Sequence, residues 1–467
     1  MRICENADKS FLGAVITIAL PVGFQNLLAT TAGMVDTIMI GSEGELAMAA
    51  VGISSQFFSL TNSCCYGFAG AALLFFAQYW GTRDEKGINR AFGIAITFMM
   101  SITLIFCGLA VIKSEFILGI YTDKESIVAA GIPYIRIAGF AYPLQVAVTL
   151  LSYLMRSTER VKAPLIGSVT GMFVNFILNW ILIYGRFGMP KMGVAGAAVG
   201  TLASTAVNVG ILLFFLLRSQ CMVRMRLRDM FNWKGGFSKQ YLGKAFPILC
   251  SEILYGFGQM LMNVVIGRQS ESAIAAVAAF QALQGMIFAF YGGISEACSV
   301  LVGKEIGAGQ HMKGYQYMKK FAVYSSVITF ALCLAILIMN RPVLVLFGLG
   351  AEAMFYVKYM LVIFLAAGTL RACNFTITNC YRASGEPVFG AVLEISGLFL
   401  ISVPATLVAG LVLHLPFLAV FACIYMDEMI RLIFEIGYTR SGKWIKPVTE
   451  AGKRALPEFW EELRTKK

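Results

Sequence analysis

Residues 19–41 read ALPVGFQNLLATTAGMVDTIMIG, an apolar stretch with a proline near its start and an aspartate near its end. A helix needs about 20 apolar residues to cross the hydrocarbon core of a bilayer, and this stretch meets that length. Pro21 interrupts the hydrogen-bond ladder of such a helix and can bend it. Asp36 is costly inside a membrane, which makes it a candidate for function.

The rest of the chain has the same apolar character. Of its 467 residues, 58% are hydrophobic and 14% are charged, and the mean hydropathy is +0.74. An ordinary soluble domain carries about 25% charged residues, so this composition excludes a soluble globular protein. We predict an all-α integral membrane protein with twelve transmembrane helices. They are expected at about 12–40, 47–80, 90–113, 127–156, 163–185, 193–218, 241–267, 274–307, 318–340, 352–382, 386–411 and 414–438.

Lys and Arg are concentrated in the loops on one side of these spans. By the positive-inside rule, those loops and both termini lie in the cytoplasm. The net charge of +12 is therefore a topology signal and requires no nucleic acid. The first apolar stretch is too long for a cleaved signal peptide. We expect a monomer in the plasma membrane of a bacterium, in contact with lipid, with a cytoplasmic amphipathic tail at 439–467.

The chain contains an internal repeat. Five anchors share one offset of 226 residues: Pro21 and Pro247, Gly41 and Gly267, residues 49–51 and 275–277, Gly81 and Gly307, and Arg156 and Arg382. Each half holds six predicted spans, so both halves enter the membrane in the same direction, as parallel repeats. We divide the chain into an amino-terminal lobe (1–218), a basic linker (219–240), a carboxyl-terminal lobe (241–438) and the tail. Two such lobes can open a cleft to either face of the membrane in turn.

Polar residues within the spans are the candidates for ion coupling. Asp36 can take up a proton or hold Na⁺, although a position near the outer interface would simply expose it to water. Asn175 and Asn179 lie one helical turn apart, so they share a face. Their oxygens and the hydroxyl of Thr201 suit an alkali cation or a hydrogen-bond network around a carboxyl group. Polar packing between helices explains the same spacing equally well.

Acids in the second half are candidates for drawing an organic cation into the cleft. Glu252 lies just after Pro247 and is the strongest of them, although an ion pair with Arg371 or Arg136 is the alternative. Glu296 and Glu394 have no assigned role. A group with i, i+3 and i, i+4 spacing is expected to pair with itself and to be structural; it consists of Asp427, Glu428, Arg431 and Glu435.

The sequence offers no site for nucleotide-driven transport. Four Gly-Lys pairs occur, and none precedes the Ser or Thr of a phosphate-binding loop; they begin at Gly243, Gly303, Gly442 and Gly452. The energy source must then be an ion gradient, with H⁺ or Na⁺ as the coupling ion and no other cofactor. An enzyme is disfavoured because His311 and His414 are isolated, and the unequal acids of the duplicated bundle disfavour a channel.

Several segments together resemble the MATE (multidrug and toxin extrusion) transporters over nearly the whole chain. Besides residues 19–41, these are AQYWGTRD (77–84), LMRSTERVKAP (154–164), VNFILN (174–179), GVAGAAVGT (193–201), FPILCSEILYGFG (246–258), VLVGKEIGAG (300–309), YRASGEP (381–387) and RSGKW (440–444). The resemblance implies a V-shaped, two-lobed bundle of twelve helices. It also implies export of cationic and amphipathic compounds in exchange for Na⁺ or H⁺.

The resemblance assigns roles to single residues. Cation coupling falls to Asp36, Asn175, Asn179 and Thr201. Asn179 stands where the family often has Asp, which favours H⁺ over Na⁺. Glu252 resembles an acid of a second family branch, but Arg371 stands where that branch tends to have Asp. The residues themselves, apart from the resemblance, suggest the other roles, since aromatic faces suit a promiscuous cavity and proline can bend a helix. The expected substrate-binding residues are Glu252, Gln25, Gln56, Gln281, Tyr66 and Tyr291, and the expected conformational residues are Pro21 and Pro247.

A lipid-linked-saccharide flippase or exporter of another lipid-like metabolite is the alternative within transport. Such a protein needs a basic cavity for pyrophosphate, which Arg136 and Arg371 could supply. Asp36 and Glu252 oppose this interpretation because they would repel the same anion.

Overall fold

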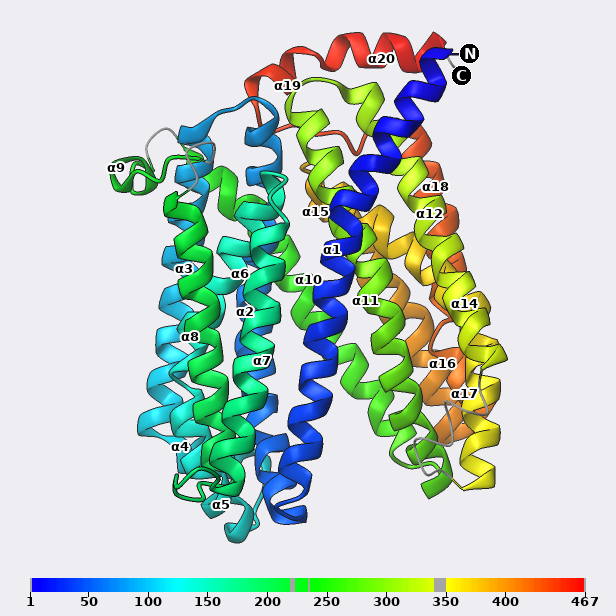
Figure 1. The fold of residues 1–467 in the computed structure, drawn as a ribbon. Coiled ribbons are helices and arrows are strands. Elements are labelled where there is room, and N and C mark those ends of the chain that lie inside the picture. The colour runs from blue at the N-terminus through cyan, green and yellow to red at the C-terminus, as the bar shows by residue number, and fades with distance from the viewer. Residues whose placement is uncertain (1, 219–222, 234–235, 340–349, 466–467) are drawn as a thin grey trace. The chain divides into compact units, whose positions relative to one another are not determined.

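The computed structural model describes residues 2–218, 223–233, 236–339 and 350–465, and within these ranges the chain is helical and has no strand (Figure 1). Ten of the helices there are long and apolar enough to cross a membrane. An eleventh span forms if α5 (Glu125–Ala138) and α6 (Ala141–Ser157), which are bent by 46°, are counted together. The prediction of an all-α, multi-pass membrane protein is confirmed.

The spans follow the predicted order along the chain. Besides the α5–α6 pair, they are α1 (Arg2–Gly41), α2 (Glu45–Gly81), α3 (Glu85–Ile112), α7 (Lys162–Tyr184), α8 (Val194–Arg218), α10 (Phe237–Ile266), α11 (Glu271–Gly307), α12 (His311–Ile338), α14 (Ala351–Ala383) and Pro387–Val412. The last of these combines α15 (Pro387–Gly397), η1 (Leu398–Ser402), α16 (Val403–Leu407) and η2 (Val408–Val412), where η marks a π-helical segment. The remaining short helices are α4 (Ser114–Tyr121), α9 (Leu227–Met230), α17 (Phe417–Cys423), α18 (Met426–Ser441), α19 (Glu450–Arg454) and α20 (Leu456–Thr465).

The twelfth predicted span, 414–438, differs from the expectation. It consists of two shorter helices, α17 and α18, and does not form one continuous apolar helix that is long enough to cross a membrane. α18 carries four ionisable residues on its buried face, which lower its hydropathy; they are Asp427, Glu428, Arg431 and Glu435. The described chain therefore has ten apolar spans, or eleven when α5 and α6 are counted together, because the buried charges of α18 lower the hydropathy of the twelfth segment.

The chain divides into two compact units. Unit 1 contains Met1–Phe24, Ala77–Arg83 and Cys250–Lys467, and unit 2 contains Gln25–Phe76 and Asp84–Leu249. The unit boundary falls shortly after Pro21 in α1 and shortly after Pro247 in α10. The predicted lobe boundaries stay a prediction, and residues 219–222 and 234–235 of the linker and 466–467 of the tail lie outside the described residues.

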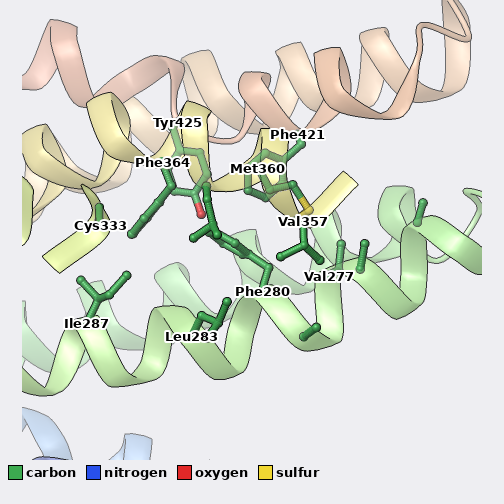
Figure 2. Packing of buried hydrophobic residues seen from close by; sticks show 14 of the residues in the cluster. Val277, Phe280, Leu283, Ile287, Cys333, Val357, Met360, Phe364, Phe421 and Tyr425 are labelled. Atoms are coloured by element: carbon green, nitrogen blue, oxygen red, sulfur yellow. The ribbon is translucent and has the colours of Figure 1, made fainter. Parts of the chain in front are cut away.

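An aromatic and aliphatic core fixes α11 against α14 in unit 1 (Figure 2). The ring of Phe280 lies 5.3 Å from that of Phe364 and 5.1 Å from that of Phe421, both edge to face. This geometry is favourable for aromatic pairs. The core holds α14 in place, and α14 carries the polar residues discussed below.

Two helix crossings depend on glycine and repeat within the molecule. In unit 2, a Cβ on Gly67 of α2 would lie 2.7 Å from the backbone nitrogen of Leu249 in α10. In unit 1, a Cβ on Gly293 of α11 would lie 2.5 Å from the backbone nitrogen of Gly23 in α1. The two contacts are related by the repeat, because Gly67 and Gly293, and likewise Gly23 and Leu249, are separated by the same offset of 226 residues. Small residues let helix backbones approach this closely.

Gly293→Ala is expected to lower the thermal unfolding midpoint of the purified protein, because overpacking costs about 1–3 kcal/mol. Gly108→Ala is the matched control, since a Cβ there meets nothing within 4 Å. Alanine favours a helix over glycine by about 1 kcal/mol, so the control should keep or raise the midpoint. Equal midpoints for both variants would show that the crossing at Gly293 tolerates a methyl group.

The tail packs on the protein. Trp444 is fully buried and its ring stacks on that of Tyr315 in α12. The apolar face of α20, with Phe459 and Leu463, is also buried, and α20 contacts α12. The structure thus gives the apolar face of this predicted amphipathic helix a protein partner.

Candidate functional site

Four residues predicted for ion coupling form one hydrogen-bonded chain in unit 2. Asn179 Nδ2 of α7 donates to Asp36 Oδ1 of α1 at 2.8 Å and to Asn175 Oδ1 at 3.2 Å. Asn175 Nδ2 donates to Thr201 Oγ1 of α8 at 3.5 Å, and that hydroxyl donates to the carbonyl of Ala197. The hydrogen bonds therefore connect polar side chains of α1, α7 and α8, and Asp36 is the single carboxylate of the set.

The local sequence explains how Asn179 reaches Asp36. The i, i+4 spacing places Asn175 and Asn179 on one face of α7. Gly200 of α8 leaves room for the amide, because a Cβ there would collide with Asn179 Oδ1. Asn179 is fully buried, and its Oδ1 has no hydrogen-bond partner among the described residues.

The site is poor in negative charge. Across the described part of the chain, no group of three or more His, Cys, Asp or Glu could hold a metal ion. A Na⁺ ion here would depend on amide and hydroxyl oxygens, with Asp36 as the one carboxylate of the hydrogen-bonded set. A proton needs only Asp36. Tyr134 of α5, which the sequence did not single out, lies within electrostatic range of Asp36.

An arginine binds α1 just after its proline. Arg156 Nη2, at the end of α6, donates to Gln25 Oε1 at 2.7 Å, and Gln25 Nε2 donates to Ser168 Oγ of α7 at 2.7 Å. Gln25 was predicted to bind substrate. In the structure it is buried, and protein groups engage both ends of its amide.

The repeat places an equivalent arginine in unit 1. Arg382 Nη1, at the end of α14, donates to Glu252 Oε1 of α10 at 3.0 Å, and its Nη2 lies 3.3 Å from Glu394 Oε2 of α15. Glu252 thus pairs with Arg382, where the sequence suggested Arg371 or Arg136. Arg136 donates to Ser114 Oγ. Arg156 and Arg382 were visible as repeat anchors, but nothing in the sequence marked them as partners of α1 and α10.

A single family model, MatE, matches the chain twice, over residues 21–181 and 247–408. The chain belongs to the MATE family of transporters. The second match of this MATE chain begins 226 residues after the first, which confirms the internal repeat found in the sequence.

Named relatives of this MATE transporter cover almost all of it. It is 21% identical to the uncharacterized transporter YisQ of Bacillus subtilis, over 94% of this chain and 96% of that protein. It is 23% identical to the probable multidrug resistance protein NorM of Thermotoga maritima, over 92% and 93% of the two chains.

Solved structures show the same fold. A transporter of the MOP superfamily from Pyrococcus furiosus superimposes with a TM-score of 0.81 at 17% identity, over 92% of this chain and 95% of that one. An outward-facing multidrug resistance MATE family transporter gives a TM-score of 0.80 at 19% identity, with the same coverage. At these identities the likeness establishes the MATE fold alone.

The remaining predicted substrate residues of this MATE transporter occupy different surroundings. Gln56 of α2 is exposed and Tyr66 is half-buried. Tyr291 of α11 is buried, and its ring packs edge to face on Phe288 and Phe375. Gln281 lines a cavity of about 80 Å³ in unit 1. Other polar residues on that cavity are Gln259, Asn263, Gln284, Arg371 and Tyr425.

Two further candidates have defined surroundings. Arg371 Nη2 donates to the Tyr255 hydroxyl, and its Nε lies 3.9 Å from Glu428 Oε1. Glu296 is half-buried in α11. The guanidinium of Arg371 is thus already paired with an acid and a phenol.

Proposed function

We propose that this MATE transporter is a secondary active multidrug efflux antiporter. It exports cationic and amphipathic organic compounds in exchange for H⁺ or Na⁺ by alternating access, with H⁺ favoured. The observation that carries the proposal is the hydrogen-bonded chain that ends on Asp36. Relatives of this transporter that are named as multidrug resistance proteins support the proposed substrate class.

The coupling step follows from the charge of Asp36. An ionised carboxylate in a span is costly, so either a proton or a cation on Asp36 stabilises the state in which it is buried. An organic cation and the coupling ion then satisfy the same negative charge at different stages of the cycle. Asn175, Asn179 and Thr201 orient the carboxylate and supply oxygens beside it.

The proposal also covers the oligomeric state, the membrane and the two prolines. The transporter works as a monomer in the bacterial plasma membrane, with both termini in the cytoplasm. Pro21 and Pro247 lie where α1 and α10 pass from one unit to the other, and they are the positions at which these helices bend. The flippase alternative has weaker support, because Arg371 is engaged by Glu428 and Tyr255.

Dye transport by reconstituted protein tests the function. Proteoliposomes carry either an H⁺ gradient or a Na⁺ gradient, imposed separately, and the flux of a cationic dye is followed by fluorescence. We expect flux with H⁺ and less or none with Na⁺ alone. Equal flux after every ion gradient has been collapsed would contradict the antiport mechanism.

Glu252→Gln is expected to weaken transport of cationic substrates more than transport of neutral ones. The carboxylate of Glu252 is 27% exposed, so it presents negative charge beyond its pair with Arg382. Removing that charge leaves Arg382 with Glu394, which limits the structural cost. The measurement compares the KM of a cationic dye with that of a neutral dye of similar size. An equal change in both values would assign Glu252 a purely structural role.

A further inference from the structure

Unit 1 holds a second group of buried ionisable side chains, on one face of α18. Asp427, Glu428, Arg431 and Glu435 are each no more than 8% exposed. The Arg431 guanidinium lies 3.7 Å from Asp427, 3.6 Å from Glu428 and 3.7 Å from Glu435. The prediction that this group pairs with itself is confirmed. All three distances exceed that of a hydrogen bond, so one arginine is shared loosely among three acids.

The charges of this group do not balance. Three carboxylates face two guanidinium groups, Arg431 and Arg371 of α14, which leaves one negative charge when every acid is ionised. The neighbouring helix α15 supplies no positive charge, because its Glu394 is an acid that shares Arg382 with Glu252 of α10. An unpaired buried charge is so costly that the group normally neutralises instead.

One further acid faces the group, because Glu394 of α15 lies within electrostatic range of Arg431 and Glu435. The other side chains that face the group are neutral. From α14 these are Cys373, Asn374, Thr378 and Tyr381, and from η1 it is Ser402. The surplus negative charge therefore has to be met by something that the protein takes up.

Two of the three acids accept hydrogen bonds from neutral side chains. Asp427 Oδ1 accepts a hydrogen bond from Ser402 Oγ at 2.7 Å. Glu428 Oε2 accepts one from Asn374 Nδ2 at 2.8 Å, and its other oxygen faces Arg371. Hydrogen bonds to the charged form of an acid stabilise that form.

Glu435 differs from them. Its side chain is fully buried, and Thr378 Oγ1 donates to its Oε1 at 3.1 Å. Its Oε2 has no hydrogen-bond partner among the described residues. A metal ion would need several oxygen ligands at this point, and the described residues offer no cluster of that kind. A proton needs only the one free oxygen.

We propose that Glu435 binds a proton on Oε2, which gives unit 1 a proton site of its own. With this proton in place, Asp427 and Glu428 balance Arg431 and Arg371. Release of the proton restores a third carboxylate beside Arg431 and draws its guanidinium toward Glu435. This site is additional to Asp36 and does not depend on which ion drives transport.

Infrared spectroscopy of the purified full-length protein tests the site. A protonated carboxyl group gives a carbonyl stretching band that an ionised carboxylate lacks. We expect such a band at neutral pH, lost in Glu435→Gln and kept in Glu461→Gln, which changes an exposed acid of α20. Glutamine mimics the neutral acid, so Glu435→Gln should fold. The same band in Glu435→Gln as in the wild type, or no band in the wild type, would overturn the proposal.

Thr378→Val provides a second readout that does not remove the acid. Loss of the Thr378 hydroxyl frees the Glu435 carbonyl from its hydrogen bond, so the band should move to higher frequency. A band that does not move belongs to another acid and contradicts the assignment. Asp36→Asn must leave the Glu435 band unchanged. Failure of the Glu435 assignment would therefore be distinguishable from failure of the role proposed for Asp36.

Discussion

Asp36→Asn is expected to abolish ion-driven efflux and leave the protein folded and inserted. Asparagine has the size of aspartate and keeps an oxygen that accepts from Asn179 Nδ2, so the contact between α1 and α7 survives. It cannot bind and release a proton, and it offers a cation no net charge. Everted vesicles with an imposed H⁺ or Na⁺ gradient should then show only background dye flux.

Asp123→Asn is the matched control, because Asp123 is an exposed acid of the same unit, between α4 and α5. It should transport like the wild type. Asn179→Ala is expected to reduce transport and not abolish it, since Asp36 keeps its charge and loses one donor. Full export by Asp36→Asn would remove Asp36 from the coupling mechanism.

The sequence predicts the local part of the candidate site because helical periodicity is local. Asn175 and Asn179 share a face through their spacing alone, and the structure joins Asn179 to Asp36 and Asn175 to Thr201. The apolar runs predict twelve spans for the same reason, and the described chain has ten of them, or eleven with α5 and α6 counted together. The repeat could also be predicted, since it needs only a constant offset between identical residues.

The partners of buried charges could not be predicted, because they come from distant segments. Arg156 reaches Gln25, and Glu435 reaches Thr378, across separations that no local pattern encodes. The same limit explains the twelfth span. From composition alone, the charged residues of α18 make its transfer into a membrane unfavourable. In the fold, hydrogen bonds from side chains of α14 and η1 offset much of this free-energy cost.

The two repeat-related arginines should respond differently to the same substitution. Arg382→Gln leaves Glu252 and Glu394 together without their shared cation. Removing one partner from a buried ion pair costs about 3–5 kcal/mol. Arg156→Gln removes a charged donor from the neutral amide of Gln25 and leaves no carboxylate behind in that contact. A hydrogen bond to a charged group contributes about 1.5–3 kcal/mol, so this loss should be smaller.

Denaturant unfolding of the purified variants in detergent measures the difference. Adding Glu394→Gln to Arg382→Gln should restore part of the lost stability, because one of the two stranded carboxylates is removed. Adding Ser168→Ala to Arg156→Gln should restore none, since Ser168 carries no charge. Equal losses for the two single variants would mean that the acids beside Arg382 are already neutral. In that case Glu252 could not attract a cation through its charge, and its proposed role in substrate binding would fall with it.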